Sequence, residues 1–75
     1  MVGIEIKKYL AEKGIKQTYL AQKIGMTDWA LSGRLAGDIE LRITEYFNIC
    51  EVLGVPLEKF LNAETIKDEK VTEED

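Results

Sequence analysis

The side chains in this sequence that could do chemistry are limited in kind. The chain has no histidine and a single cysteine, Cys50. The lack of histidine excludes histidine general bases and histidine zinc ligands, and one cysteine forms neither an intrachain disulfide nor a Cys-only metal site. We also find no paired carboxylates typical of a catalytic cleft and no glycine-rich phosphate loop. We therefore expect a protein that is not an enzyme, with no catalytic residue, metal, cofactor or small-molecule substrate.

The informative stretch runs from Gln17 to Leu35. Within it, the carboxylate of Asp28 can accept a hydrogen bond from cytosine N4, and an exposed Trp29 can contact a thymine methyl group or a protein partner. Each residue also has a simpler interpretation. An acidic residue is favoured in the first turn of a helix by the helix dipole, and Trp29 can instead belong to the core. The sequence leaves both alternatives open.

Short helices must position these side chains. Single glycines interrupt the apolar periodicity at residues 14, 25, 37 and 54 and serve as helix stops. Thr27 and Thr44 are suited to N-cap positions, and Pro56 suits a first helical turn. Because strand signals are absent, we predict an all-α fold whose five helices cover residues 4–13, 17–24, 27–35, 44–53 and 56–61.

The second and third predicted helices meet at a tight turn that contains Gly25. Glycine adopts the left-handed conformation that such a turn requires, and the small Ala21 allows the two helices to cross closely. We expect the crossing to be filled by Leu20, Ile24, Met26 and Leu31. This is the helix-turn-helix arrangement, in which the N-terminus of the second helix enters the major groove.

The distribution of charge separates a domain from a tail. The chain has 75 residues and a formal net charge of −4, which arises entirely from residues 63–75, because residues 1–62 carry eight acidic and eight basic side chains. We assign residues 1–62 to one helix-turn-helix domain and residues 63–75 to an acidic, frayed tail. No apolar run approaches the ~20 residues of a membrane span, and no secretory signal is recognised, so we expect no membrane association and a cytoplasmic location.

The sequence resembles the Cro/CI, or Xre-type, family of phage and bacterial repressors over residues 4–62. The resemblance is carried by Gly14-Ile15-Lys16-Gln17, Leu20-Ala21-Gln22-Lys23-Ile24-Gly25-Met26-Thr27, Leu35-Ala36-Gly37 and Leu53-Gly54-Val55-Pro56-Leu57-Glu58-Lys59-Phe60-Leu61. It implies a compact five-helix, lambda-repressor-like DNA-binding domain. It also implies sequence-specific binding to a double-stranded DNA operator, transcription regulation as a repressor, and a weak homodimer.

The resemblance also implies roles for individual residues. Asp28, Trp29 and Gly33 occupy positions that face base edges in the family, and Ser32 lies nearby. The family glutamine at Gln17 bonds a phosphate, and Lys16 adds a charge that can reach one. The remaining contacts to phosphate are expected from Thr27, which caps the recognition helix, and from Arg34.

The sequence departs from the family at Leu10 and Leu35. Relatives often carry an arginine and a glutamate at these positions, which form a buried ion pair. Replacing both halves of such a pair by apolar residues can be neutral or stabilising. We therefore expect the two leucines to be buried close to each other.

Other apolar residues have simpler assignments. We expect Phe47, Cys50 and Leu53 to point inward from the fourth helix, and Tyr19 and Tyr46 to be packing residues. The neutral domain and the acidic Asp28 keep an alternative open, a protein-interaction module of the same fold that binds a regulator rather than DNA. A steep salt dependence of binding to duplex DNA would distinguish the two.

Overall fold

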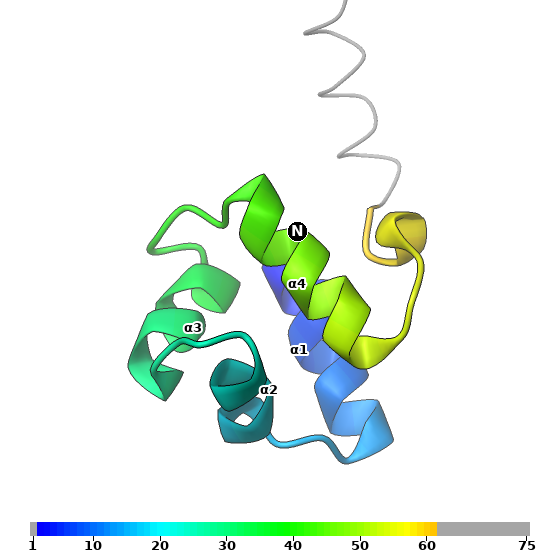
Figure 1. The fold of residues 1–75 in the computed structure, drawn as a ribbon, viewed down its shortest axis with the longest axis horizontal. Helices are drawn as coiled ribbons and strands as arrows, with labels where there is room; N and C mark the ends of the chain where they lie inside the picture. The colour runs from blue at the N-terminus through cyan, green and yellow to red at the C-terminus, as the bar shows by residue number, and fades with distance from the viewer. Residues whose placement is uncertain (1, 62–75) are drawn as a thin grey trace, which may run out of the picture.

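Helices account for most of the computed structural model, which describes residues 2–61 (Figure 1). No strand occurs in this range, which confirms the all-α prediction. The predicted fifth helix is shorter than expected, because after Pro56 the chain forms only a three-residue 3-10 helix. The predicted acidic tail, residues 63–75, lies outside the described residues. The elements are α1 (Val2–Lys13), α2 (Gln17–Lys23), α3 (Asp28–Ala36), α4 (Ile43–Leu53) and η1 (Leu57–Lys59).

Both ends of α3 are fixed by residues that the sequence predicted. The Oγ1 atom of Thr27 accepts the backbone N–H of Ala30 at 3.0 Å, so it satisfies one of the free amides of the first turn. At the other end Gly37 has φ 90°, a left-handed conformation that an L side chain rarely adopts. Its N–H bonds the carbonyl of Arg34. Helix α3 therefore begins and ends where the local sequence dictates.

The first residue of α4 and the face that it buries differ from the prediction. The helix begins at Ile43, and its N-cap is Arg42 rather than Thr44. The backbone N–H of Arg42 is satisfied by the Glu45 carboxylate at 2.9 Å. The buried face consists of Tyr46, Ile49 and Cys50, whereas Phe47 is 46% exposed and the assignment of that residue to the core was wrong.

Tyr46 takes the inward position on α4 because it has partners there. Its ring meets that of Phe60 edge to face, with centroids 6.5 Å apart, and its hydroxyl donates to the carbonyl of Leu57. These contacts tie the chain after α4 back onto that helix. The packing role predicted for Tyr46 is confirmed, while the one predicted for Tyr19 is wrong, since Tyr19 is 49% exposed.

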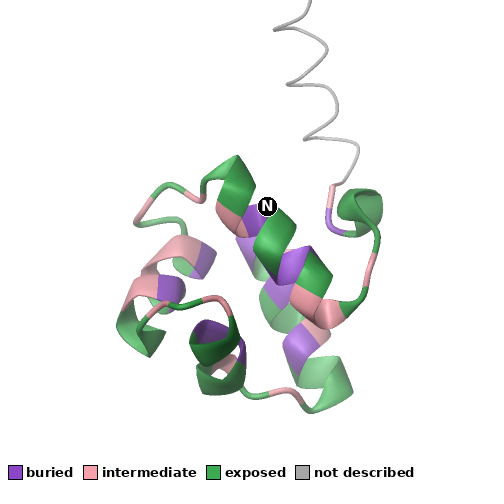
Figure 2. Cartoon of the chain, viewed as in Figure 1, coloured by how far each residue is buried: buried purple, intermediate pink, exposed green. Residues whose placement is uncertain are grey.

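The core contains residues from all four α-helices and Phe60 (Figure 2). Leu10 and Leu35 are both buried in it, at 4% and 0% exposure, as the departure from the family predicted. Cys50 is also buried, as expected. Within residues 2–61, no helix is both long and apolar enough to cross a membrane. The buried set is Ile6, Leu10, Leu20, Ala21, Leu31, Leu35, Tyr46, Ile49, Cys50 and Phe60.

A close approach of α1 to α3 depends on Gly3. A Cβ atom built on Gly3 would lie 2.1 Å from the backbone carbonyl oxygen of Leu35 and 2.7 Å from its carbonyl carbon. Backbone atoms inside a helix cannot move aside as a flexible side chain can. A residue without a side chain is therefore required where the first turn of α1 meets the last turn of α3.

We predict that Gly3→Ala lowers the free energy of unfolding by about 1–3 kcal/mol, because the added methyl group forces the two helices apart. Gly33→Ala is the matched control. There the new Cβ would meet Ile39 Cδ1 at 2.7 Å, the far end of a flexible side chain that can rotate away. Urea unfolding of both variants measures the difference. Equal stability of the two variants would contradict a tight α1–α3 contact.

Candidate nucleic-acid interface

Helices α2 and α3 form one packed unit. The turn between them is closed by the N–H of Met26, which bonds the carbonyl of Ala21 at 2.9 Å. Leu20 and Leu31 are fully buried and Ala21 is 2% exposed, so the crossing has an apolar centre, as predicted. Gly25 has φ 75°, which the sharp change of direction requires. The orientation of α3 is thus set by its packing on α2.

The two helices are also joined at their N-terminal ends. Gln17 Nε2, on the first residue of α2, donates to Asp28 Oδ1, on the first residue of α3, at 3.1 Å. The bond lies at the exposed surface. It leaves the second N–H and the carbonyl oxygen of Gln17, and the second oxygen of Asp28, available for other partners. A predicted phosphate ligand and a predicted base reader therefore form one hydrogen-bonded unit.

The outer face of α3 begins with a large exposed side chain. Trp29 is 77% exposed, which decides against the interpretation that it belongs to the core. Ser32 is exposed one turn further along the helix, and Thr27 is exposed at the N-cap. Side chains three residues apart lie on neighbouring parts of a helix surface, so Trp29 and Ser32 can reach a common partner. The start of α3 therefore exposes one large apolar group and the hydroxyl groups of Thr27 and Ser32.

Arg34, a predicted phosphate ligand, is also engaged within the protein. Arg34 Nε bonds Glu45 Oε1 at 3.0 Å, and its Nη1 donates to the carbonyl of Ala30 at 2.9 Å. The hydrogen bond from the Arg42 backbone N–H, assisted by Arg34, lowers the pKa of Glu45. Arg34 therefore joins α3 to α4, and a contact with phosphate, which stays a prediction, would use its remaining N–H groups.

Gly33, which was predicted to face base edges, also contacts another segment of the chain. It is half-buried, and Ile39 from the connector lies against the place where its side chain would be. Its backbone carbonyl accepts the N–H groups of Asp38 and Ile39 at 2.9 and 3.1 Å. The glycine thus lets the connector fold closely against α3. Its approach to base edges stays a prediction.

The charge at this surface comes from α2 and the residue before it. Lys16 is exposed at the N-cap of α2, and its side chain makes no capping hydrogen bond. Lys23 Nζ lies 5.6 Å from the ring centroid of Tyr19, an exposed cation–π pair that our sequence analysis missed. The spacing of the two residues by four positions on a helix is the signal that would have revealed it.

A comparison with known proteins agrees with this geometry. A family model described as helix-turn-helix matches residues 6–60, which is more than half of the chain. No curated protein and no solved structure matches the sequence. Among the described residues, no group of three or more acidic or cysteine side chains is placed to hold a metal ion. The chain belongs to the Cro/CI, or Xre-type, helix-turn-helix family of DNA-binding transcription regulators.

Proposed function

We propose that the protein binds double-stranded operator DNA with sequence specificity through α3 and represses transcription in the cytoplasm. The observation that carries the proposal is the Gln17–Asp28 hydrogen bond, which joins the exposed N-terminal ends of α2 and α3. Helix N-termini carry free backbone N–H groups that favour phosphate. Two helix ends held at a fixed spacing allow α2 to contact the DNA backbone while α3 enters the adjacent major groove.

The positioning contacts come from the N-terminal end of α2. Gln17 donates its second amide N–H to a phosphate while its first N–H holds Asp28. Lys16, exposed beside it, adds a positive charge, and the exposed Thr27 lies at the entrance of α3. Contacts of this kind fix the orientation of the protein on the duplex without reading its sequence.

The reading contacts come from the first two turns of α3. The free oxygen of Asp28 accepts a hydrogen bond from cytosine N4, and Trp29 lies against a thymine methyl group. The hydroxyl group of Ser32 contacts either a donor or an acceptor one turn further on. We therefore propose an operator half-site that presents a cytosine and a thymine methyl group to the N-terminal end of α3.

Titrations at several salt concentrations test the positioning contacts. Gln17→Ala removes a hydrogen bond to a charged group, so we expect binding to all duplexes to weaken by about 1.5–3 kcal/mol. Lys16→Ala removes one phosphate contact, so the slope of log K against log salt should become less steep by about one unit. Gln22→Ala is the control, because Gln22 is exposed on α2 but lies on a different side of that helix from Gln17.

The same titrations decide between the two functions. Trp29, at 77% exposure, would be a suitable anchor for a protein partner. If the wild-type chain binds neither a selected operator nor a scrambled duplex at low salt, the DNA proposal fails. A partner-binding module then replaces it. If the wild-type chain binds both duplexes equally, specific recognition fails and only general DNA binding remains.

A further inference from the structure

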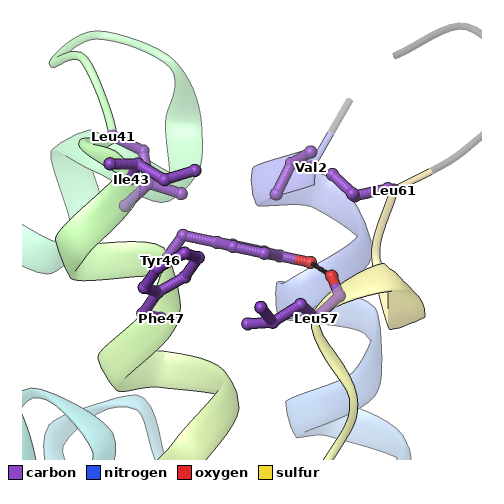
Figure 3. A pocket seen from close by; sticks show the side chains of 7 residues that line it. All are labelled: Val2, Leu41, Ile43, Tyr46, Phe47, Leu57 and Leu61. Atoms are coloured by element: carbon purple, nitrogen blue, oxygen red, sulfur yellow. Dashed lines mark hydrogen bonds between the residues drawn. The ribbon is translucent and has the colours of Figure 1, made fainter. Parts of the chain in front are cut away.

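Ile39, in the connector between α3 and α4, is an apolar residue whose burial the core does not explain. It is half-buried, yet within residues 2–61 it is not one of the partly buried apolar residues that pack against the core. Leu41, two residues further on, is one of them, and it also lines an apolar groove of about 420 Å³ between α4 and residues 57–61 (Figure 3). Ile39 does not line this groove. The two residues therefore pack against different parts of the molecule.

The side chain of Ile39 lies against α3, at Gly33. A Cβ atom built on Gly33 would lie 2.7 Å from Cδ1 and 3.1 Å from Cγ1 of Ile39. The ethyl group of Ile39 thus occupies the place where a side chain of residue 33 would begin. The backbone holds it there, because the N–H groups of Asp38 and Ile39 donate to the carbonyl of Gly33 at 2.9 and 3.1 Å. The connector therefore supplies the apolar atoms that α3 lacks at this position.

The other end of the connector is also tied to α3. The Glu45 carboxylate accepts the backbone N–H of Arg42 at 2.9 Å and Nε of Arg34 at 3.0 Å, so it joins the last residue of the connector to α3. A segment that is fixed before binding loses less conformational entropy when it meets a partner. The backbone of the connector is therefore preorganised to present Ile39 beside α3.

This place belongs to the face of α3 that carries Trp29. Residues four apart are neighbours on a helix surface, and Trp29 precedes Gly33 by four positions. The exposed Trp29 and the half-buried Ile39 thus lie on neighbouring parts of one face. Asp38 and Glu40, which flank Ile39, are exposed and acidic, so they repel phosphate. An apolar contact is therefore the contribution that this part of the connector can make to DNA binding.

We propose that Ile39 determines specificity by contacting a thymine methyl group in the major groove, at a base pair other than the one that Trp29 contacts. Apolar side chains recognise thymine by its C5-methyl group, which no other base presents there. One helical turn is about 5.4 Å long and base pairs are about 3.4 Å apart, so side chains one turn apart can face different base pairs. This proposal rests on the proposed operator binding and adds a second thymine to the half-site.

Operators in which single thymines are replaced by uracil test the proposal, because uracil pairs like thymine but lacks the methyl group. We expect the wild-type chain to lose affinity about fourfold at each of two positions of a half-site, the contribution of about one buried methyl-sized group. In Ile39→Ala one of these two losses should disappear, and in Trp29→Ala the other. Ile43→Ala is the matched control, because it removes the same atoms from an exposed side chain that lines the groove of Figure 3, and it should retain both losses.

A second variant, Ile39→Val, removes only Cδ1 and should reduce the same loss, so the test does not depend on the folding of Ile39→Ala. The proposal is wrong if a folded Ile39 variant retains both losses in full. It is also wrong if the wild-type chain responds to uracil only where Trp29→Ala removes the response. Sequence-specific binding with either result leaves the proposed function intact, whereas a wild-type chain that binds no duplex would refute the proposed function and this proposal together.

Discussion

Replacing Leu35 with glutamate should lower the free energy of unfolding by about 3–5 kcal/mol, because the carboxylate would be buried without a partner. Leu35 is 0% exposed and belongs to the same core cluster as Leu10. Native domains are stabilised by only about 5–15 kcal/mol in total, so the variant should lose a large fraction of its stability. Thermal melting followed by circular dichroism measures the loss.

A double variant makes this prediction sharper. Leu10→Arg alone should be destabilised for the same reason as Leu35→Glu, because Leu10 is 4% exposed. With both changes present, the arginine and the glutamate can form an ion pair, so the loss should be smaller than the sum of the two single losses. Leu35→Met serves as the control for shape and should cost less than about 1.5 kcal/mol. If Leu35→Glu melts like the wild type, or if the two losses simply add, the leucine pair does not replace a buried ion pair.

The sequence predicted those parts of the fold that depend on local residues. The bounds of α3 follow from the side-chain cap of Thr27 and the left-handed conformation of Gly37, both of which act within one turn. The α2–α3 crossing follows from the spacing of its apolar residues around Gly25. The burial of Leu10 and Leu35 was likewise predicted, because the family pattern relates two distant positions to each other.

Contacts between distant segments could not be predicted in this way. The apolar spacing in α4 allows either Tyr46 or Phe47 to face the core. Tyr46 faces inward because Leu57 and Phe60, which follow α4 in the chain, contact its hydroxyl and its ring. The need for a glycine at position 3 depends on the backbone of α3, more than 30 residues away. Such constraints come from tertiary packing rather than from local preference.

In the candidate site, too, local features were predicted and contacts between distant segments were not. Thr27, Asp28 and Trp29 were placed at the start of α3 from the cap signal, and the structure places them there. The bond of Arg34 to Glu45 could not be predicted, since the connector between α3 and α4 has no regular spacing that relates the two helices. The Gln17–Asp28 bond likewise depends on how the α2–α3 turn orients two helix ends.

The Gln17–Asp28 bond leads to the sharpest expectation about operator choice. In Asp28→Asn, the amide oxygen can still accept from Gln17, but the group turned toward the bases becomes an NH₂ donor. Cytosine N4 is itself a donor and should be disfavoured. Adenine N7 can accept from the NH₂ group, while adenine N6 donates to the second lone pair of the amide oxygen. Because one base loses and the other gains about 1–3 kcal/mol each, the preference should change by about 2–6 kcal/mol.

The control for this change is Asp38→Asn, which removes the same charge from an exposed aspartate just beyond α3. Both variants reduce repulsion of phosphate and should bind all duplexes somewhat more tightly at low salt. Only Asp28→Asn should exchange cytosine for adenine at one position of a selected operator. If its affinity rises equally on every duplex, the carboxylate serves only the helix N-terminus. Specificity at that end of α3 then rests on Trp29 and Ser32.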